Sequence, residues 1–240
     1  MKKDKEETVD IVPLVPYIVH QLKTPLTAIS GFSDILLHAA ERKLSDKEMN
    51  YLSSIAESSV VLLNMLNSLS EFSKLESGQR VVNAHNFLIN DVVESIIDEF
   101  TVAAAEKGIS IETAVNSFQV FADFGMAHRA LKSLLDNSIK NSSRGGTITV
   151  RVTEAEDCVN LTVIDDGNCI DKEILDNIFD VEYQIRHHTS NTGIGLGLAI
   201  AKRSIELQGG SICVNSVQGI GTNVKISLPK KVIPPISKFT

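Results

Sequence analysis

The 240-residue chain lacks several features that would place it in other protein classes. No uninterrupted apolar window approaches the ~18 residues that a membrane-spanning helix needs, and the basic start is followed by acids instead of the apolar core of a signal peptide. The three cysteines, Cys158, Cys169 and Cys213, include no CxxC pair. This excludes a disulfide framework and a cysteine zinc site, and it suits a reducing compartment. Internal repeats and low-complexity segments are also absent.

The chain has no excess of positive charge either. Its 23 Lys and Arg against 30 Asp and Glu give a net charge of −7, which disfavours sequence-independent binding to nucleic acid. Hydrophobic residues make up 43% and charged residues 22%, as in an ordinary globular protein with enough apolar material for a sizeable core. The length suits one large domain or two small ones.

The first third has the apolar spacing of two long amphipathic helices. In residues 11–40 and 46–76, apolar side chains recur at steps of three, four or seven. Ser45 and Glu48 have the spacing of a capping box for the second helix, and Gly78 closes it. The sequence predicts an antiparallel helical hairpin. Two helices alone cannot bury both apolar stripes, so we expect pairing with a second copy into a four-helix bundle.

After residue 80, helical and extended patterns are mixed. Helices are predicted over 88–106, 125–141 and 199–207. The predicted strands are 109–115, 118–122, 147–152, 158–164, 211–217 and 223–228. The sequence thus predicts an α+β chain with a domain boundary near residue 80 and a frayed tail after residue 231.

A glycine run precedes the last predicted helix. It reads Gly193-Ile194-Gly195-Leu196-Gly197-Leu198. Small residues let backbone N–H groups approach a ligand, and a helix N-terminus favours phosphate. The run is neither a Walker A loop nor a Rossmann fingerprint, because the lysine of the first and the glycine spacing of the second are missing. Alone, it is equally consistent with a flexible loop before a helix.

Two other polar features are also ambiguous when taken separately. Asp165 ends an apolar strand, where a carboxylate can accept from an adenine amino group or simply form a turn. Asn137, Lys140 and Asn141 share one helix face, where an amide oxygen can bind Mg²⁺ and a lysine can reach phosphate. Such a polar face is usually just solvated. The order of the three features along the chain makes the combination specific.

That combination resembles the sensor histidine kinases of two-component signalling, over about residues 13–230. The resemblance implies a hairpin that forms a dimeric four-helix bundle (1–79) and a Bergerat-type α/β sandwich that binds ATP (80–231), followed by a tail (232–240). It further implies an ATP-dependent autokinase that passes its phosphoryl group to an aspartate of a response-regulator receiver domain.

The first predicted helix contains a segment similar to the family's phosphoacceptor box. It reads His20-Gln21-Leu22-Lys23-Thr24-Pro25-Leu26-Thr27-Ala28-Ile29. His20 would be the phosphoacceptor, because it lies beside core position Val19 but off the apolar seam, and a neutral imidazole is a usable nucleophile near pH 7. Gln21 stands where the family usually has an acidic base; an amide cannot take up a proton, so slow autokinase activity is expected. Thr24 matches the position that orients water for dephosphorylating the partner, which predicts phosphatase activity.

The resemblance also assigns a nucleotide site. Asn137 would bind Mg²⁺, Lys140 the phosphates and Asp165 the adenine, and residues 168–192 would form a lid that nucleotide orders. The other expected nucleotide contacts are Asn141, Gly167, Cys169, Ile170, Gly193, Gly195, Leu196, Gly197, Leu198 and Thr222. Departures from the family pattern stand at Ser133, Asn141, Cys169 and Glu182, where the family has asparagine, tyrosine, glycine and an aromatic residue.

These assignments imply ATP and Mg²⁺ as cofactors and a homodimer that binds neither nucleic acid nor, through this segment, a membrane. We expect a cytoplasmic location, with or without a membrane tether upstream. Two alternatives stay open. A degenerate, non-catalytic nucleotide-binding dimer would act as a scaffold or phosphatase, and an ATPase or serine kinase of the same superfamily would lack phosphohistidine.

Overall fold

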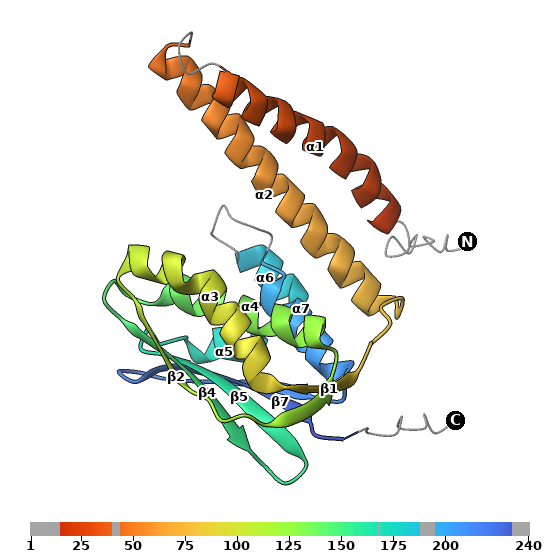
Figure 1. The fold of residues 1–240 in the computed structure, drawn as a ribbon, viewed down its shortest axis with the longest axis vertical. Helices are drawn as coiled ribbons and strands as arrows, with labels where there is room; N and C mark the ends of the chain where they lie inside the picture. Colours follow the sequence, from red (N-terminus) through yellow and green to blue (C-terminus); the bar gives the residue numbers. More distant parts are fainter. Residues whose placement is uncertain (1–14, 40–43, 168, 188–194, 232–240) are drawn as a thin grey trace, which may run out of the picture. The chain divides into compact units, whose positions relative to one another are not determined.

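The computed structural model describes residues 15–39, 44–167, 169–187 and 195–231 (Figure 1). They form two compact units, and the chain passes from one to the other after Arg80. We call residues 15–80 the hairpin, and residues 81–187 with 197–231 the sheet domain. Among the described residues, no helix is long and apolar enough to cross a bilayer.

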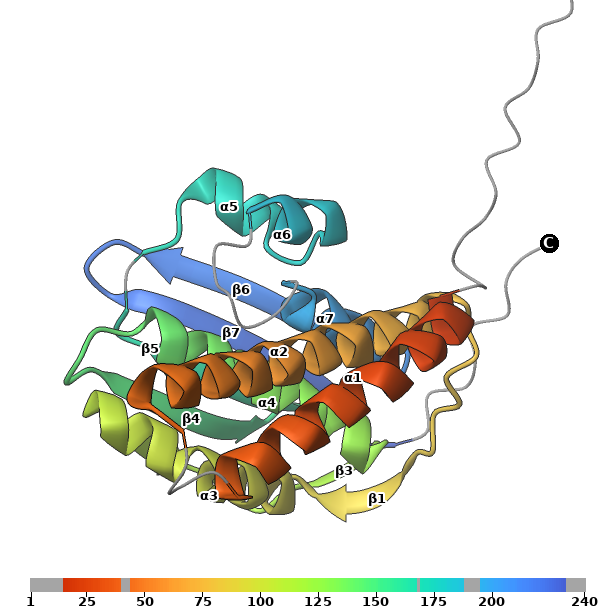
Figure 2. The ribbon, with the colours of Figure 1, turned by 90° about the horizontal axis from the view of Figure 1, so that it is seen from above.

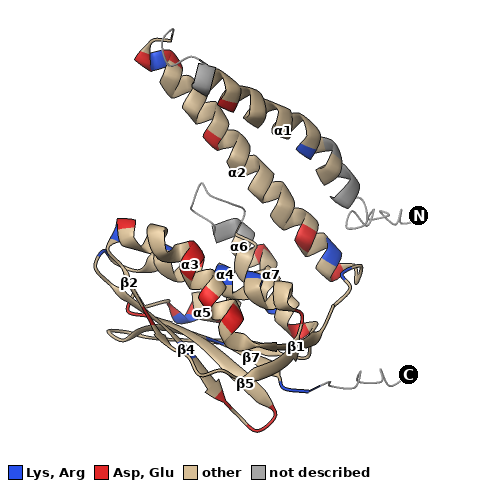
Figure 3. Cartoon of the chain, viewed as in Figure 1, with Lys and Arg blue, Asp and Glu red and all other residues tan. Residues whose placement is uncertain are grey.

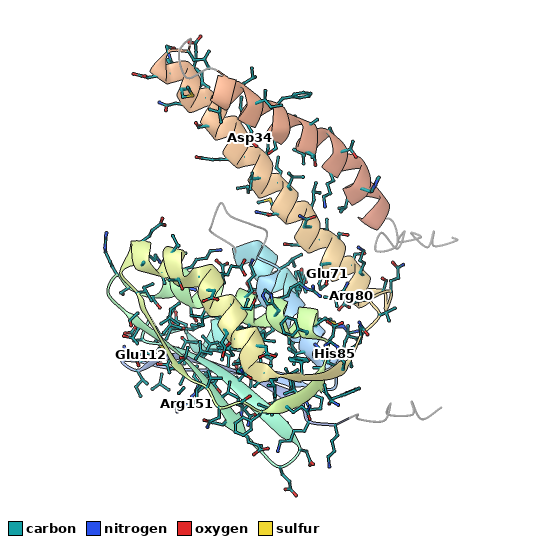
Figure 4. All side chains as sticks on the ribbon, viewed as in Figure 1. Asp34, Glu71, Arg80, His85, Glu112 and Arg151 are labelled. Atoms are coloured by element: carbon teal, nitrogen blue, oxygen red, sulfur yellow. The ribbon has the colours of Figure 1, made fainter. Side chains whose placement is uncertain are left out.

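The hairpin consists of α1 (Val15–Ala39) packed against α2 (Asp46–Glu76). The predicted capping box is confirmed: the Ser45 hydroxyl accepts from the Glu48 N–H at 3.4 Å, and the Glu48 carboxylate accepts from the Ser45 N–H at 2.8 Å. Past the end of α2, Arg80 Nε lies 3.9 Å from Glu71 Oε1 (Figure 4). This ion pair holds the segment that follows α2 close to the last turns of the helix.

Much of the apolar surface of the hairpin stays exposed in a single chain. Val19 is buried, whereas Leu22, Ile29 and Leu36 are about half exposed. The middle of α2 carries no charged residue between Glu57 and Glu71, and Figure 3 shows this uncharged stretch. The partner helix of the same chain therefore covers only part of these apolar side chains, which agrees with the expectation that a second copy covers the rest.

A five-stranded sheet forms one layer of the sheet domain. Its order is β2 (Ser110–Ala114), β4 (Thr147–Glu154), β5 (Cys158–Asp165), β7 (Gly221–Pro229), β6 (Ser211–Val217). The β2–β4 pair is parallel, and the other pairs are antiparallel. A separate antiparallel pair joins β1 (His85–Leu88) to β3 (Gln119–Ala122).

Helices form the second layer. They are α3 (Ile89–Lys107), α4 (Phe124–Asn141) and α7 (Gly197–Glu206), and Figure 2 shows them on one side of the sheet. Two short helices, α5 (Lys172–Asn177) and α6 (Val181–His187), follow β5. Alternate strand residues are buried against the helices, for example Leu161 and Val163 on β5. Each such side chain contributes about 1.5–3 kcal/mol.

Asp123 fixes the start of α4, the helix that carries the predicted amide–lysine face. Its carboxylate caps α4 by accepting from the Met126 N–H at 3.0 Å, and it also accepts from the Asn83 N–H at 2.9 Å. Its own N–H donates to Gln208 Oε1 at 2.6 Å. The α4 N-terminus is thereby tied to the chain entering the domain and to the end of α7.

The α+β fold class is confirmed, with a helical hairpin followed by a two-layer sheet domain. Each predicted helix and strand is present, with ends shifted by a few residues at most. Sequence patterns missed β1, α5 and α6. All three are short, and β1 exists only because it pairs with β3, some thirty residues later in the chain.

Candidate functional site

A cavity of about 270 Å³ lies in the sheet domain beside α4 and the end of β5. Several predicted site residues line it: Asn137, Asn141, Asp165, Cys169, Ile170, Leu198 and Thr222. The remaining lining residues are Ile174, Ile178 and Gln184, which lie in the predicted lid but were not predicted as individual contacts. Segments far apart in the sequence thus supply one concave surface with apolar walls and a few polar groups, the usual character of a small-molecule site.

Asp165, the last residue of β5, holds the most constrained polar group in the cavity. Only 5% of its surface is exposed. Its Oδ2 accepts from the Ser138 hydroxyl at 2.9 Å, and its Oδ1 accepts from the Gly167 N–H at 3.1 Å. The backbone of Thr222, paired with Asp165 across the β5–β7 ladder, also favours the ionised carboxylate. The Ser138 and Gly167 donors hold the two oxygens from different sides and fix the orientation of the carboxylate.

Two opposing influences set the protonation of this carboxylate. Burial raises the pKa of Asp165 above its ordinary value near 3.8, and the negative charge of neighbouring Asp166 acts in the same direction. The hydrogen bonds from Ser138, Gly167 and Thr222 oppose the rise in pKa, because they stabilise the ionised form. A buried carboxylate held in a cavity by several donors is typical of a binding site.

The neighbouring Asp166 has a different role, although the sequence does not distinguish the two residues. It is exposed, and its Oδ2 accepts from the Thr147 N–H at 2.8 Å, which fastens the start of β4. The choice of Asp165 for base recognition therefore agrees with its place in the cavity.

Two glycines allow the backbone to approach Asp165 closely. A Cβ atom on Gly167 would lie 2.8 Å from Asp165 Oδ1 and 3.0 Å from the Asn141 carbonyl oxygen. A Cβ atom on Gly221 would lie 1.9 Å from the Asp165 carbonyl oxygen, and Gly221 has a φ of +113°. Both positions exclude a side chain, and the need for glycine at 221 was not visible in the sequence.

Asn137 and Asn141 present amides to the cavity from the last turns of α4. The Asn141 amide donates to the Asn137 carbonyl oxygen at 2.8 Å and to its side-chain Oδ1 at 3.1 Å. Asn137 Oδ1 keeps a second lone pair for a cation. Among the described residues, no group of three or more His, Cys, Asp or Glu is placed so that it could hold a metal ion. One amide oxygen fits Mg²⁺, which usually binds one or two protein oxygens together with phosphates and water.

Lys140, the predicted phosphate contact, lies on the exposed side of α4. Its ammonium pairs with Asp136 at 2.7 Å, and the residue does not line the cavity. The structure thus brings Asn137 and Asn141 to the cavity but leaves Lys140 outside it. Its role at phosphate remains a prediction.

The end of the sheet is connected to the start of the predicted lid. The Ile170 N–H donates to Ser216 Oγ at 3.0 Å, and Ser216 Oγ lies 3.0 Å from Thr222 Oγ1. Because Thr222 pairs with Asp165 across the β5–β7 ladder, these hydrogen bonds place the segment that follows β5 close to the Asp165 end of that strand. Within the predicted lid, Gln184 Nε2 donates to the Ile178 carbonyl at 2.6 Å. Ser216 carried no signal that sequence reasoning used.

Of the described residues of the glycine run, 195–198, Leu198 is the one that lines the cavity. Gly197 begins α7, and a Cβ atom there would lie 2.7 Å from Ser133 Oγ, so α4 and α7 approach each other closely at this glycine. Gly195 has a φ of +78°, and Leu196 is buried. Gly193 lies outside the described residues.

In the hairpin, His20 is exposed on α1. Thr24 Oγ1, one turn later, donates to the His20 carbonyl at 3.4 Å, so both residues share a face. Lys23 Nζ donates to Asn67 Oδ1 on α2 at 3.0 Å. The Gln21 side chain lies outside the described part of the structure. An exposed imidazole is open to a phosphoryl donor and to a partner protein.

Two family models match the chain, one in each part. The model described as "His Kinase A (phospho-acceptor) domain" matches residues 14–78, and the model described as "Histidine kinase-, DNA gyrase B-, and HSP90-like ATPase" matches residues 122–232. The first covers His20, and the second covers the whole cavity.

Curated relatives have the same combination. An uncharacterized sensor-like histidine kinase of Rhizobium meliloti is 31% identical over 217 residues, covering 88% of this chain and 41% of that protein. The circadian input-output histidine kinase of a Synechocystis strain is 32% identical, covering 92% of this chain and 31% of that protein. The chain thus spans less than half the length of these relatives.

Solved structures show the same fold. Full-length ShkA in complex with AMPPNP has a TM-score of 0.76 at 23% identity, over 90% of this chain and 45% of that chain. The histidine kinase AdeS of Acinetobacter baumannii has a TM-score of 0.65 at 23% identity, over 89% of this chain and 98% of that chain. With a phospho-acceptor hairpin and an ATPase-type sheet domain matched in order, the chain belongs to the sensor histidine kinases, as a catalytic core with its phospho-acceptor domain.

Proposed function

We propose that this chain is an ATP-dependent autokinase that phosphorylates His20 and passes the phosphoryl group to an aspartate of a response-regulator receiver domain. The observation that carries the proposal is the buried Asp165 carboxylate, oriented by the Ser138 and Gly167 donors in a cavity that Asn137 also lines. The exposed His20 supplies the nucleophile. Both features belong to the parts that the two family models match.

In this proposal the sheet domain binds and orients the nucleotide. Asp165 accepts a hydrogen bond from the adenine amino group, while Ile170, Ile174 and Leu198 supply apolar walls for the base. The Asn137 oxygen binds Mg²⁺, which, when bound, neutralises charge on the phosphates. The work of these residues is positioning, and positioning accounts for much of phosphoryl transfer catalysis.

The chemical step takes place on His20. One ring nitrogen attacks the γ-phosphorus of ATP, the bond to the β-phosphate oxygen breaks, and ADP leaves. The other ring nitrogen must then lose a proton. Gln21 cannot accept it, so the proton passes to solvent and the step is slow. General-base catalysis contributes roughly 10²–10⁴-fold, which sets the scale of the expected deficit.

Two further parts of the proposal concern the hairpin. Thr24, on the same face as His20, orients water for dephosphorylating the receiver aspartate, so the balance of activities is shifted toward phosphatase. The hairpin also pairs with a second copy. Supporting this, an open groove of about 620 Å³ between α1 and α2 is lined mainly by apolar residues, among them Leu26, Ile29 and Ile55.

The decisive experiment is incubation with γ-labelled ATP and Mg²⁺. The wild-type chain should acquire label that is stable to base and lost in acid, and His20→Ala should acquire none. Label that persists on His20→Ala, or sits on serine, contradicts the assignment. ATP binding without any label would instead favour the non-catalytic dimer, to which the substitutions at Gln21 and Cys169 point.

A second variant tests the role of the missing base. Gln21→Glu restores a proton acceptor beside His20, so autophosphorylation should speed up by about 10²-fold. Ala28→Glu adds a carboxylate of the same kind at an exposed position of α1 more than two turns beyond His20, where it cannot reach the ring, and should give no comparable gain. An unchanged rate in Gln21→Glu would contradict the base argument while leaving the kinase assignment intact.

A further inference from the structure

The segment that follows β5 is tied to the edge of the sheet by one hydroxyl group. β6 is an edge strand, and β7 lies between it and β5. Near the end of β6, Ser216 Oγ accepts a hydrogen bond from the Ile170 N–H at 3.0 Å. Between Asp165, the last residue of β5, and Ile170, the chain therefore crosses the end of β7.

A glycine at the start of β7 lets the chain take this path. A Cβ atom on Gly221 would lie 2.9 Å from Asp166 Cα, so the segment runs directly against the backbone of β7 there. Beyond Ile170, α5 packs beside β6 (Figure 2). The segment after β5 thus follows the end of the sheet as far as its edge strand.

The Ser216 hydroxyl also has partners on β7. It donates to the Gly221 carbonyl at 3.3 Å, and its oxygen lies 3.0 Å from Thr222 Oγ1. A hydroxyl has one hydrogen and two lone pairs. Donation to Gly221, together with acceptance from Ile170 and Thr222, uses all three. These partners hold the hydroxyl in place, and the hydroxyl in turn holds the Ile170 N–H.

Two of these partners belong to the nucleotide cavity. Ile170 and Thr222 line it, and Ser216 lies behind them on β6. The Ile170 side chain also packs against the buried core of the sheet domain. A wall residue on a connecting segment is mobile unless something fixes it, and ordering it on binding reduces affinity. A hydrogen bond that fixes Ile170 beforehand removes that cost.

We propose that Ser216 is a positioning residue for nucleotide binding, whose hydroxyl holds Ile170 at the cavity so that this wall of the site is formed before ATP binds. The proposal rests on the proposed function, since it assumes that the cavity binds ATP.

Two substitutions at Ser216 isolate the hydroxyl. Valine and threonine have nearly the same shape and both suit a strand, but threonine keeps the hydroxyl. Ser216→Val should therefore lose the tie to Ile170, and Ser216→Thr should retain it. Ser211→Val is the matched control on the same strand, because Ser211 is exposed at the other end of β6.

The first experiment is amide hydrogen exchange of the full chain by NMR, without nucleotide. In Ser216→Val, the Ile170 amide should exchange about tenfold faster than in wild type, because it loses its acceptor. In Ser216→Thr and Ser211→Val, its exchange should stay slow. This readout reports the tie to Ile170 itself, whether or not the cavity binds ATP.

The second experiment is calorimetric titration of the same proteins with ATP in the presence of Mg²⁺. In Ser216→Val, the dissociation constant should rise by about five- to tenfold, and Ser216→Thr should bind as wild type does. The autophosphorylation rate at saturating ATP should not change, because nucleotide that is already bound meets the same groups. A KM effect without a kcat effect is the signature of this role.

The outcomes separate the two proposals. Equal ATP affinity in Ser216→Val and Ser216→Thr, or slow exchange at Ile170 in both, would overturn the role of Ser216 and leave the ATP site standing. A loss of affinity in Ser216→Val that Ser211→Val matches would show a general effect on β6 and would also overturn it. A wild-type chain that binds no ATP would overturn both proposals.

Discussion

The hairpin and the sheet domain of this kinase core differ in how completely a single chain buries their apolar side chains. In the sheet domain, alternate strand residues and the inner faces of α3, α4 and α7 form one buried cluster. In the described hairpin, Val19 and Leu75 are the buried apolar residues, whereas Phe32 is 66% and Ile35 61% exposed. The sheet domain thus has a hydrophobic core of its own, whereas the hairpin exposes an apolar surface of the kind that is buried by association with another molecule.

The same contrast appears in the functional groups. Asp165 is buried and held by donors from two segments, which suits its proposed role in recognising one ligand. His20 is exposed, which suits its proposed role as an acceptor that meets both a nucleotide and a partner protein. Substitutions in the sheet domain should therefore act within one chain, and substitutions on the hairpin should act through association.

The largest effect should come from Gly221→Ala in the sheet domain. The new Cβ would lie 1.9 Å from the Asp165 carbonyl oxygen, at a φ of +113°, so β5 and β7 would have to separate. We expect the free energy of unfolding of the sheet domain to drop by about 4 kcal/mol or more, measured by chemical denaturation.

Gly219→Ala is the matched control for this change. Gly219 also has a positive φ, +78°, but a Cβ there would meet nothing within 4 Å. Its cost should be limited to backbone strain, about 1 kcal/mol. Equal losses in the two variants would show that the contact with Asp165 is not what requires glycine at 221.

The second-largest effect should come from a substitution in the apolar surface of the hairpin, where a second copy is expected to bind. Ile29 is 46% exposed on α1 and lines the groove between the helices. If a second copy buries it, Ile29→Ser should weaken the dimer by about 3 kcal/mol, roughly a 100-fold rise in the dissociation constant. Sedimentation equilibrium measures this directly. Ala28→Ser, at the exposed neighbouring position, should leave the dimer unchanged, and a wild-type chain that stays monomeric at micromolar concentration would contradict the expectation.

Asp165→Asn should separate binding from stability. Loss of a hydrogen bond to a charged acceptor should weaken ATP binding by about 10–100-fold in calorimetric titration. Stability should not fall, because burial disfavours the ionised carboxylate, and the Ser138 hydroxyl can turn to accept from an amide.

The pH dependence of stability shows in which direction the ionisation of Asp165 changes the free energy of unfolding. Because the folded-state pKa of Asp165 is raised, the unfolded chain ionises first as pH increases. The contribution of Asp165 to the stability of the folded state is therefore fully present below the ordinary pKa of an aspartate. It is lost as the pH rises through the higher pKa that Asp165 has in the folded state. Thermal unfolding of wild type should show this loss relative to Asp165→Asn. Parallel pH profiles for the two proteins would contradict it.

The sequence predicted what is local and periodic. The limits of α1 and α2 follow from apolar spacing and a capping box, and the strands after residue 140 follow from alternation. Among the residues that line the cavity, Asn137 and Asp165 were accessible through the order of motifs, and Thr222 through the family resemblance. The cavity contribution of Gln184 and the hydrogen bond from Ser138 were not, because both depend on which residues the tertiary fold brings beside β5. The need for glycine at 221 likewise arises from the β5–β7 register.

The smallest effect tests the part of the hairpin that a single chain completes by itself. Ser45→Ala removes one side of the capping box, whose hydroxyl accepts from the Glu48 N–H. Loss of an N-cap lowers stability by about 1 kcal/mol, and here it destabilises the first turn of α2.

The hydrogen bonds from Ser45 lower the pKa of Glu48. The Ser45→Ala variant should therefore also return the pKa of Glu48 toward its ordinary range, which NMR titration can follow. Ser58→Ala, in the interior of α2, removes a hydroxyl that only donates to the Ser54 carbonyl and should cost less. Because the cap lies within one chain, its loss should lower the unfolding temperature of the hairpin. It should not raise the dissociation constant of the dimer, as Ile29→Ser is expected to do. A rise of similar size in Ser45→Ala would mean that the hairpin folds and dimerises in a single step.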